Sequence, residues 1–251
     1  MLIHQTQEKL HSLKLEGMLL ALQEQMDSGN VSNLAFEERL GLLVDREWLS
    51  RQDRQAARRL KVAKLRHQAC VEDVDFRHPR GLDRGVFMDL ATLRWVRAHR
   101  NLIMTGPTGI GKTWLACALA NKACREGLSA AYFRVPRLIQ ELILARADGS
   151  YFKLLARLAK TDLLLLDDWA IARLDGQAQQ DVLEVIDDRA GLRSTLLLSQ
   201  APTNKWHDNI GDPTVADAIL DRVLGTATRL TLMGKTMRKE PTVKADLKPT
   251  E

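Results

Sequence analysis

A short glycine-rich segment constrains this chain more than any other feature. The segment GPTGIGKTW, residues 106–114, follows the apolar run NLIMT and precedes the amphipathic stretch WLACALANKACREG. It matches G-x-x-x-x-G-K-[ST] at every fixed position. Glycines let the backbone curl so that consecutive N–H groups point inward, and a helix that follows adds its positive end. A chance glycine-rich turn is the alternative, but the flanking strand and helix favour a loop that wraps phosphate groups.

The residue types in this loop predict a nucleotide and a metal ion as ligands. Lys112 is placed to reach the β- and γ-phosphates and to assist their transfer, and the Thr113 hydroxyl is placed to ligate Mg²⁺. ATP and Mg²⁺ are therefore the expected cofactors. The segment TNKWHD lacks the spacing of the guanine motif N-K-x-D, which argues against GTP. The residues expected to bind the nucleotide are Gly106, Pro107, Thr108, Gly109, Ile110, Gly111, Lys112, Thr113 and Trp114.

Two adjacent carboxylates follow a run of four leucines in LLLLDDWA, residues 163–170. A phosphate-binding loop needs a carboxylate at the end of another buried strand to hold Mg²⁺, and Asp167 fits that position. Asp168 is then left to orient or deprotonate the attacking water. Helix N-capping is the alternative reading of this pair. At the end of the next apolar run, Ser199 and Gln200 are candidates to contact the γ-phosphate. The alternative is that they are ordinary polar residues at the end of a strand.

Continuous apolar runs alternate with helical segments in the larger part of the chain. Such runs are typical of strands that are covered on both faces of a parallel sheet. We therefore expect an α/β fold with a parallel five-stranded sheet flanked by helices, preceded by a small all-helical N-terminal domain. The expected domains are residues 1–75, 76–238 and a polar, disordered tail at 239–251. The expected strands are residues 101–105, 129–135, 162–167 and 194–200, with a weaker fifth at 229–233.

The composition fits a soluble protein of the cytoplasm. The 251 residues include 27% charged and 45% hydrophobic residues, with a net charge of +5. A mild positive surplus favours polyanionic partners without specifying one. Three cysteines without a CxxC pair suit a reducing compartment. The first residues lack the basic-then-apolar layout of a signal peptide, and no apolar run approaches membrane-spanning length, so we expect no membrane partner.

Several longer segments together resemble one known family. GPTGIGKTWLACALANKA, LLLLDDWA, LLLSQAPTNKWHDNIGDPTVADAILDRV and LMGKTMRK are similar to the IstB-type ATP-binding helpers of insertion-sequence transposition. These belong to the AAA+ initiator and helicase-loader clade, together with DnaC. The resemblance spans about residues 5–238, and its second half is much more specific than the phosphate loop. Helicase loaders usually have Ser-Asn where this chain has Ser199-Gln200, which favours the transposition helpers.

The resemblance implies further site residues and a sheet order. Arg222 in LDRV resembles the arginine finger that enters a neighbouring subunit's ATP site, so the chain is expected to form homo-oligomers with ATP at their interfaces. An arginine on a helix surface, paired to Asp217 or Asp221, is the alternative. Arg238 in GKTMRK resembles the second sensor arginine. The strand before the phosphate loop is expected to lie beside the LLLSQ strand.

Two basic segments are candidates for contact with DNA phosphates. Residues 51–66 carry seven positive charges on a predicted helix, although charge runs of this kind are usually solvated helix faces. In the family, the 136–160 segment lies where helices face nucleic acid; there we expect Tyr151 and Phe152 to be core residues. The predicted DNA contacts are Arg51, Arg54, Arg58, Arg59, Lys61, Lys64, Arg137, Arg146, Lys153 and Arg157, and Arg66 is one further charge of the first segment.

These features together predict an ATP-dependent DNA-binding assembly ATPase. We expect it to help a separate transposase select and engage double-stranded DNA, largely without sequence preference, and to be nucleoid-associated when bound. A replicative helicase loader like DnaC is the main alternative, and a small-molecule P-loop kinase is a further one. We expect slow intrinsic hydrolysis that rises on assembly, because Asp168 is shorter than the glutamate that many such ATPases carry.

Overall fold

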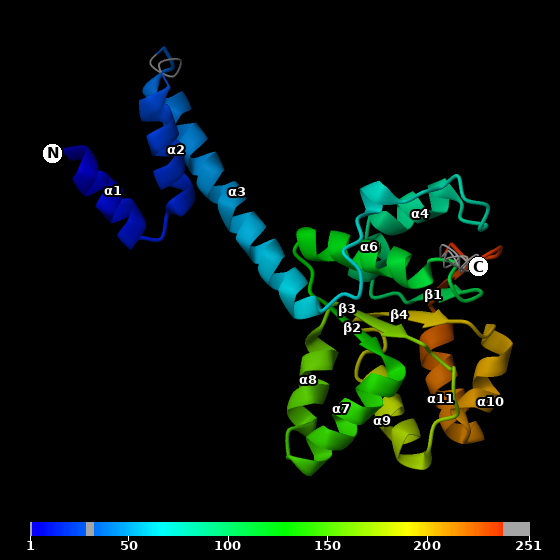
Figure 1. The fold of residues 1–251 in the computed structure, drawn as a ribbon. Coiled ribbons are helices and arrows are strands. Elements are labelled where there is room, and N and C mark those ends of the chain that lie inside the picture. The colour runs from blue at the N-terminus through cyan, green and yellow to red at the C-terminus, as the bar shows by residue number, and fades with distance from the viewer. Residues whose placement is uncertain (1, 29–32, 238–251) are drawn as a thin grey trace, which may run out of the picture.

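The computed structural model describes residues 2–28 and 33–237, which form a helical arm and a larger α/β body (Figure 1). Three helices make up the arm: α1 (Leu2–Ser12), α2 (Glu16–Asp27) and α3 (Phe36–Ala63). Helices α2 and α3 pack as an antiparallel hairpin. Their backbones meet closely at Gly17, where a Cβ atom would lie 2.6 Å from the Glu47 Cα. A larger residue at this position would therefore push the two helices apart.

The body is built on a sheet of five parallel strands in the order β2-β3-β4-β1-β5. The strand before the phosphate loop, β1, lies beside β4, which confirms the expected order. Each strand agrees with its predicted run to within one or two residues. The strands are β1 (Leu102–Thr105), β2 (Ala130–Arg134), β3 (Leu163–Asp167), β4 (Ser194–Ser199) and β5 (Thr228–Thr231).

The strand side chains alternate between two hydrophobic cores. In β3, Leu163 and Leu165 belong to one core, and Leu164 and Leu166 belong to the other. Because both faces of the sheet are covered, the strand sequence is apolar throughout rather than alternating. On the first face lie α4 (Arg84–Ala91), α5 (Arg94–Arg97) and α6 (Lys112–Arg125). On the second face lie α7 (Val135–Ala147), α8 (Tyr151–Lys160), α9 (Gly176–Asp187), α10 (Trp206–Ile210) and α11 (Pro213–Leu224).

Local sequence signals set where several helices begin. Asp83, Asp175 and Asp212 each accept a hydrogen bond from the backbone amide three residues later, at the starts of α4, α9 and α11.

Short 3₁₀ turns are present at Val71–Asp73 and Thr203–Lys205. None of the helices in the described part of the chain is long and apolar enough to cross a membrane.

The arm joins the body through the end of its longest helix. Ala63 in the last turn of α3 is buried in the first core, and Leu60 and Leu65 pack against that core. Helix α3 ends where Lys64 adopts a left-handed backbone with φ of 50°. Residues 66–74 then run along the body, with Ala69, Val71 and Val74 in the same core. The segment just before residue 75, the predicted domain boundary, therefore already packs on the body.

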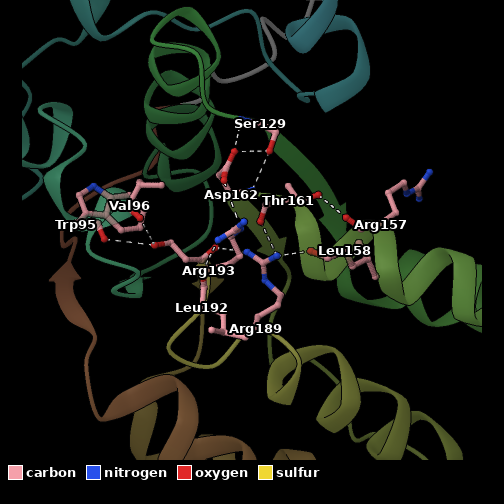
Figure 2. A network of polar contacts seen from close by, with 11 residues as sticks. Trp95, Val96, Ser129, Arg157, Leu158, Thr161, Asp162, Arg189, Leu192 and Arg193 are labelled. Atoms are coloured by element: carbon pink, nitrogen blue, oxygen red, sulfur yellow. Dashed lines mark hydrogen bonds and ion pairs between the residues drawn. The ribbon is translucent and has the colours of Figure 1, made fainter.

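A buried arginine connects the amino ends of the central strands (Figure 2). Arg189 is 1% exposed, and its guanidinium donates to the carbonyl oxygens of Leu158, Thr161 and Ser194 and to the Thr195 hydroxyl. Burial lowers the pKa of Arg189 to about 9, so it still carries its charge at neutral pH. The expected phosphate loop lies at the opposite, carboxyl ends of the strands.

Candidate nucleotide-binding site

The GPTGIGKTW segment forms the loop after β1 and the first residues of α6, as its spacing predicts. It lines a pocket of about 600 Å³ together with residues from the ends of β3 and β4. Gly106 has φ of 145°, and a Cβ atom there would lie 2.3 Å from the Leu232 carbonyl oxygen. Only glycine fits such a conformation and such an approach. Of the residues predicted to bind the nucleotide, Thr108, Gly109, Gly111, Lys112, Thr113, Trp114, Ser199 and Gln200 line this pocket.

Lys112 is buried at the base of the loop, with 7% of its surface exposed. Its Nζ donates to the carbonyl oxygens of Gly106, at 2.8 Å, and Pro107, at 3.0 Å. Burial lowers the pKa of Lys112, while the carboxylates of Asp167 and Asp168 oppose this effect. The ammonium group thus lies inside the loop, where the phosphates of a nucleotide would be held.

Thr113 and Asp167 meet in the pocket although 54 residues separate them. The Thr113 Oγ1 donates to the Asp167 Oδ2 at 2.9 Å. Asp167 is 5% exposed, and its Oδ1 accepts the Asp168 amide at 2.9 Å. A hydroxyl and a carboxylate oxygen side by side are the hard oxygen donors that Mg²⁺ prefers when phosphate oxygens and water complete its shell. These residues therefore fit the metal that the sequence predicts.

Asp168 follows β3 in a left-handed backbone conformation, with φ of 58°. A non-glycine residue pays about 1 kcal/mol or more for this geometry, so the surrounding contacts must hold it. The next residue, Trp169, is 2% exposed and donates its amide to the Leu198 carbonyl oxygen at 2.9 Å. The Asp168 carboxylate accepts a hydrogen bond from the Arg134 Nε at the end of β2. The N-capping alternative does not apply, because α9 begins only at Gly176 and is capped by Asp175.

The two candidates at the end of β4 differ in their surroundings. Ser199 is 1% exposed, donates its hydroxyl to the Trp169 carbonyl oxygen at 2.7 Å and accepts the Ala201 amide at 3.1 Å. Its hydroxyl therefore holds the turn after β3, and a contact with phosphate would have to break these bonds. Gln200 is exposed and accepts a hydrogen bond from the Thr108 hydroxyl of the phosphate loop. Gln200 is the better placed of the two to contact a nucleotide.

Two side chains beside Asp167 were not predicted as parts of the nucleotide site. The Tyr132 hydroxyl on β2 donates to the Asp167 Oδ2 at 2.8 Å, and burial together with this carboxylate raises the pKa of Tyr132. The Arg66 Nη1 lies 4.0 Å from the same oxygen. Arg66 appeared in the sequence only as one charge of the basic stretch. The signal that could have found Tyr132 is its place near the end of a strand next to β3.

Arg222, the predicted arginine finger, lies on α11 outside the residues that line this pocket. Its side chain is 33% exposed and pairs with Asp187 on α9, and its Nη1 donates to the Ala218 carbonyl oxygen at 2.9 Å. The predicted alternative partners, Asp217 and Asp221, are thus not the ones it contacts. Arg238 and the tail at 239–251 lie outside the described residues. The preceding Met237 lines the pocket, and its amide donates to the Gly109 carbonyl oxygen at 2.9 Å.

Several predicted DNA contacts are engaged within the protein. Arg51 and Arg54 both pair with Glu47, a carboxylate that is 6% exposed and that also accepts the amides of Gly17 and Met18. Glu47 thus ties these two arginines to the start of α2. Part of their charge is neutralised there, which weakens the prediction that they contact DNA.

In the body, the predicted DNA contact Arg146 is engaged within the protein, although its side chain is still 41% exposed. Its guanidinium pairs with the fully buried Asp181 and lies 3.7 Å from the centre of the Tyr151 ring. Tyr151 is a core residue, as predicted, but Phe152 is 76% exposed, so its assignment to the core was wrong. Phe152 points outward because Tyr151, one residue earlier on the helix, already occupies the buried face.

The other cations remain available at the surface, with one exception. Arg59 is half-buried and donates to the Cys124 carbonyl oxygen of α6, at 3.5 Å, and to Gln55, at 3.2 Å. Arg137 is exposed and lies 4.0 Å from the Glu141 carboxylate. The exposed candidates that remain are Arg58, Lys61, Lys64, Arg137, Lys153 and Arg157.

Comparison with known proteins gives the family of the chain. The family model described as IstB-like ATP binding protein matches residues 8–245. The chain belongs to this family. A putative insertion sequence ATP-binding protein of Sinorhizobium fredii is 51% identical over 95% of this chain and 98% of its own length. A putative ATP-binding protein in an insertion sequence of Mycobacterium tuberculosis is 33% identical over 91% of this chain and 92% of its own.

Solved structures resemble the body of this IstB-like protein. The crystal structure of DnaI matches with a TM-score of 0.56 and 22% identity, over 66% of this chain and 91% of that one. The DnaC helicase loader matches with a TM-score of 0.52 and 20% identity, over 62% and 93% of the two chains. AMPPCP-bound DnaA from Aquifex aeolicus matches at 0.55 and 19%, over 66% and 51%. At such identities the likeness shows the fold, which is the P-loop AAA+ fold.

Proposed function

We propose that this IstB-like protein is an ATP-dependent, DNA-binding assembly ATPase that helps a transposase select and engage target DNA. One observation carries the proposal. The phosphate loop, the Thr113–Asp167 pair and Gln200 meet in one pocket of about 600 Å³. They do so in a chain 51% identical to a putative insertion sequence ATP-binding protein.

The pocket residues support hydrolysis of ATP. The loop amides and Lys112 bind the phosphate chain, and Thr113 and Asp167 hold Mg²⁺, which when bound neutralises charge on the β- and γ-phosphates. Asp168 orients the attacking water and accepts its proton. In the structure one oxygen of this carboxylate, Oδ2, is bonded to Arg134, and this pair restrains the orientation of the carboxylate and lowers its basicity toward water.

The position of Arg222 supports an active site shared between subunits. It lies outside the pocket of its own chain and is a third exposed. A guanidinium whose ion-pair partner is the exposed Asp187 can exchange this partner for the γ-phosphate of a neighbouring subunit at modest cost. Hydrolysis would then depend on assembly, which gives slow turnover in the isolated monomer.

DNA binding is the least constrained part of the proposal. The exposed cations at the end of α3 and on α7 and α8 suit phosphate contacts, which do not read sequence. We therefore propose double-stranded DNA as the polyanion and a homo-oligomer as the bound form. The DNA partner places the protein in the cytoplasm and on the nucleoid.

The decisive experiment is size-exclusion chromatography with light scattering on a short DNA duplex, with ATP, with ADP and without nucleotide. We expect ATP to produce a large DNA-bound assembly and the other two conditions to produce smaller species. The Lys112→Ala variant should give the nucleotide-free profile in ATP. An unchanged profile for Lys112→Ala would contradict the proposal.

A pull-down with a transposase and with a replicative helicase separates the two partner classes. Retention of the transposase in ATP supports the proposal, whereas retention of the helicase alone would assign the protein as a helicase loader. Turnover that needs a small phosphate acceptor and ignores DNA would assign it as a kinase.

A further inference from the structure

A second buried cation borders the nucleotide pocket besides Lys112. Arg80 is 2% exposed, lines the pocket, and comes from the segment that leads from the arm into the body. No carboxylate of the described residues forms an ion pair with its guanidinium, and its Nε has no hydrogen-bond partner. Burial is the main effect on its pKa and lowers it. Enclosing an unpaired charge in this way is costly, so its position needs a reason.

Arg189 shows how a purely structural buried arginine is accommodated in the same molecule. Its Nε and both terminal nitrogens donate to oxygen atoms, four of them in total. Arg80 has one well-formed bond, from Nη2 to the Asp75 carbonyl oxygen at 2.9 Å. Its Nη1 makes a long contact of 3.4 Å to the Ile110 carbonyl oxygen and one of 3.1 Å to the Met237 sulfur, a weak acceptor. Arg80 is thus left with unused donor capacity.

The guanidinium lies where α6 begins. Its Nη1 is 2.7 Å from the position that a Cβ atom would take on Gly111, the residue before the first turn of α6. The positive end of a helix dipole, Lys112 and Arg80 therefore converge on the same wall of the pocket. Aspartates also line the pocket, but none of those described forms an ion pair with Arg80, so these three sources of positive potential favour a bound anion at this wall.

Backbone bonds hold Arg80 in this place. The Met233 amide donates to the Arg80 carbonyl oxygen at 2.9 Å, and the Met237 amide donates to the Gly109 carbonyl oxygen at 2.9 Å. The segment Met233–Met237 thus connects Arg80 to the phosphate loop. Because the backbone on both sides is fixed, the side chain is oriented before a ligand arrives, which lowers the entropy cost of binding.

We propose that Arg80 binds the diphosphate group that ADP and ATP share, from the side of the arm. The inference rests on the proposed nucleotide site and adds a binding residue outside the G-x-x-x-x-G-K-[ST] motif. It differs from a γ-phosphate sensor, because a residue that contacts the shared diphosphate affects both nucleotides alike.

Calorimetric titration of the full chain with ADP and with ATP, without DNA, tests this assignment. For Arg80→Met we expect the affinity for both nucleotides to fall about 10- to 100-fold, the range for a lost charge-assisted hydrogen bond. Arg80→Lys keeps the charge without the fork geometry and should lose less. Arg84→Met removes an exposed arginine of the same segment, outside the pocket, and should bind as the wild type does.

The melting temperature without nucleotide serves as the measure of folding. If Arg80→Met is less stable yet binds ADP with wild-type affinity, the residue is only structural and the inference is wrong. A loss confined to ATP would overturn it as well. If Arg80→Met does not fold, Arg80→Lys decides, with weaker binding of both nucleotides supporting the inference and unchanged binding refuting it. A wild-type chain that binds neither nucleotide would instead overturn the proposed function itself.

Discussion

At the scale of single residues, the two adjacent aspartates after β3 have different surroundings, and the proposed function gives Asp168 the catalytic role. Its backbone is held in a left-handed conformation, and its carboxylate is bonded to Arg134. Asp167 has a different environment, because three donors from Thr113, Tyr132 and its own neighbour's amide surround it. Asp167 is therefore the more firmly held of the two, which suits the proposed metal ligand, whereas the Arg134 pair restrains Asp168 in the proposed catalytic role.

Arg134→Met should raise the basal ATP turnover of the isolated protein by about tenfold. The substitution removes a charged hydrogen bond of about 1.5 kcal/mol that keeps the Asp168 carboxylate from the attacking water. Phosphate release without DNA measures the effect. Arg137→Met is the matched control, since Arg137 is an exposed arginine three residues later on α7. Turnover that is unchanged or lower in Arg134→Met would show that the pair does not restrain Asp168.

At the scale of elements, the parallel strands bring the phosphate loop and the ends of β3 and β4 together at one edge of the sheet, where the segment before α4 and Met237 complete the pocket. The register pairs Thr105 of β1 with Ser199 of β4, so the phosphate loop and Gln200 leave the sheet together. At the opposite edge the strands need another support, because their amino ends leave carbonyl groups to be satisfied. Arg189 supplies it by bonding to residues before β3 and at the start of β4 (Figure 2).

Arg189→Met should lower the free energy of unfolding by about 3 kcal/mol. The substitution removes the hydrogen bonds that the buried carbonyl oxygens of Leu158, Thr161 and Ser194 accept from the guanidinium, at about 1 kcal/mol or more for each. Denaturant unfolding followed by circular dichroism measures this change in the free energy of unfolding. Arg193→Met is the comparison, because Arg193 is partly exposed and pairs with Asp162. This substitution should lower the free energy of unfolding by less than about 1 kcal/mol. An equal loss of unfolding free energy in the two variants would contradict the role of Arg189 at the amino ends of the strands.

At the scale of the whole molecule, the ATP pocket of one chain lacks a contribution from Arg222. Arg222→Ala should bind ATP about as tightly as the wild type while its turnover falls about 100-fold or more. Mixing it with Asp168→Asn should restore part of the turnover, because some interfaces then combine an intact Asp168 with an intact Arg222. Phosphate release from the mixture measures this, with Arg229→Ala, an exposed arginine on β5, as the control. A mixture no more active than its two components would rule out a shared site.

The sequence by itself determined the phosphate loop, the carboxylate pair and the five strands. These features depend on local rules: glycine geometry over nine residues, and apolar runs that suit strands covered on both faces. Capping aspartates likewise mark helix starts from neighbouring residues alone. Local rules also mispredicted Phe152, because adjacent residues on a helix point about 100° apart and the local sequence does not say which of the two aromatic side chains the packing covers.

Only the tertiary structure decided which basic side chains are exposed to solvent and which are engaged by other groups of the protein. Arg146 is engaged by Asp181, 35 residues away, and the contact of Arg80 with Met237 spans 157 residues. Arg66 and Tyr132 also meet Asp167 only in the folded chain. The segment after α3 brings Arg66 to this carboxylate, and the pairing of β2 with β3 brings Tyr132. The sequence does not distinguish a basic side chain that faces solvent from one that faces a buried carboxylate or a phosphate pocket. Its role depends on desolvation and on the partner that the fold places within reach.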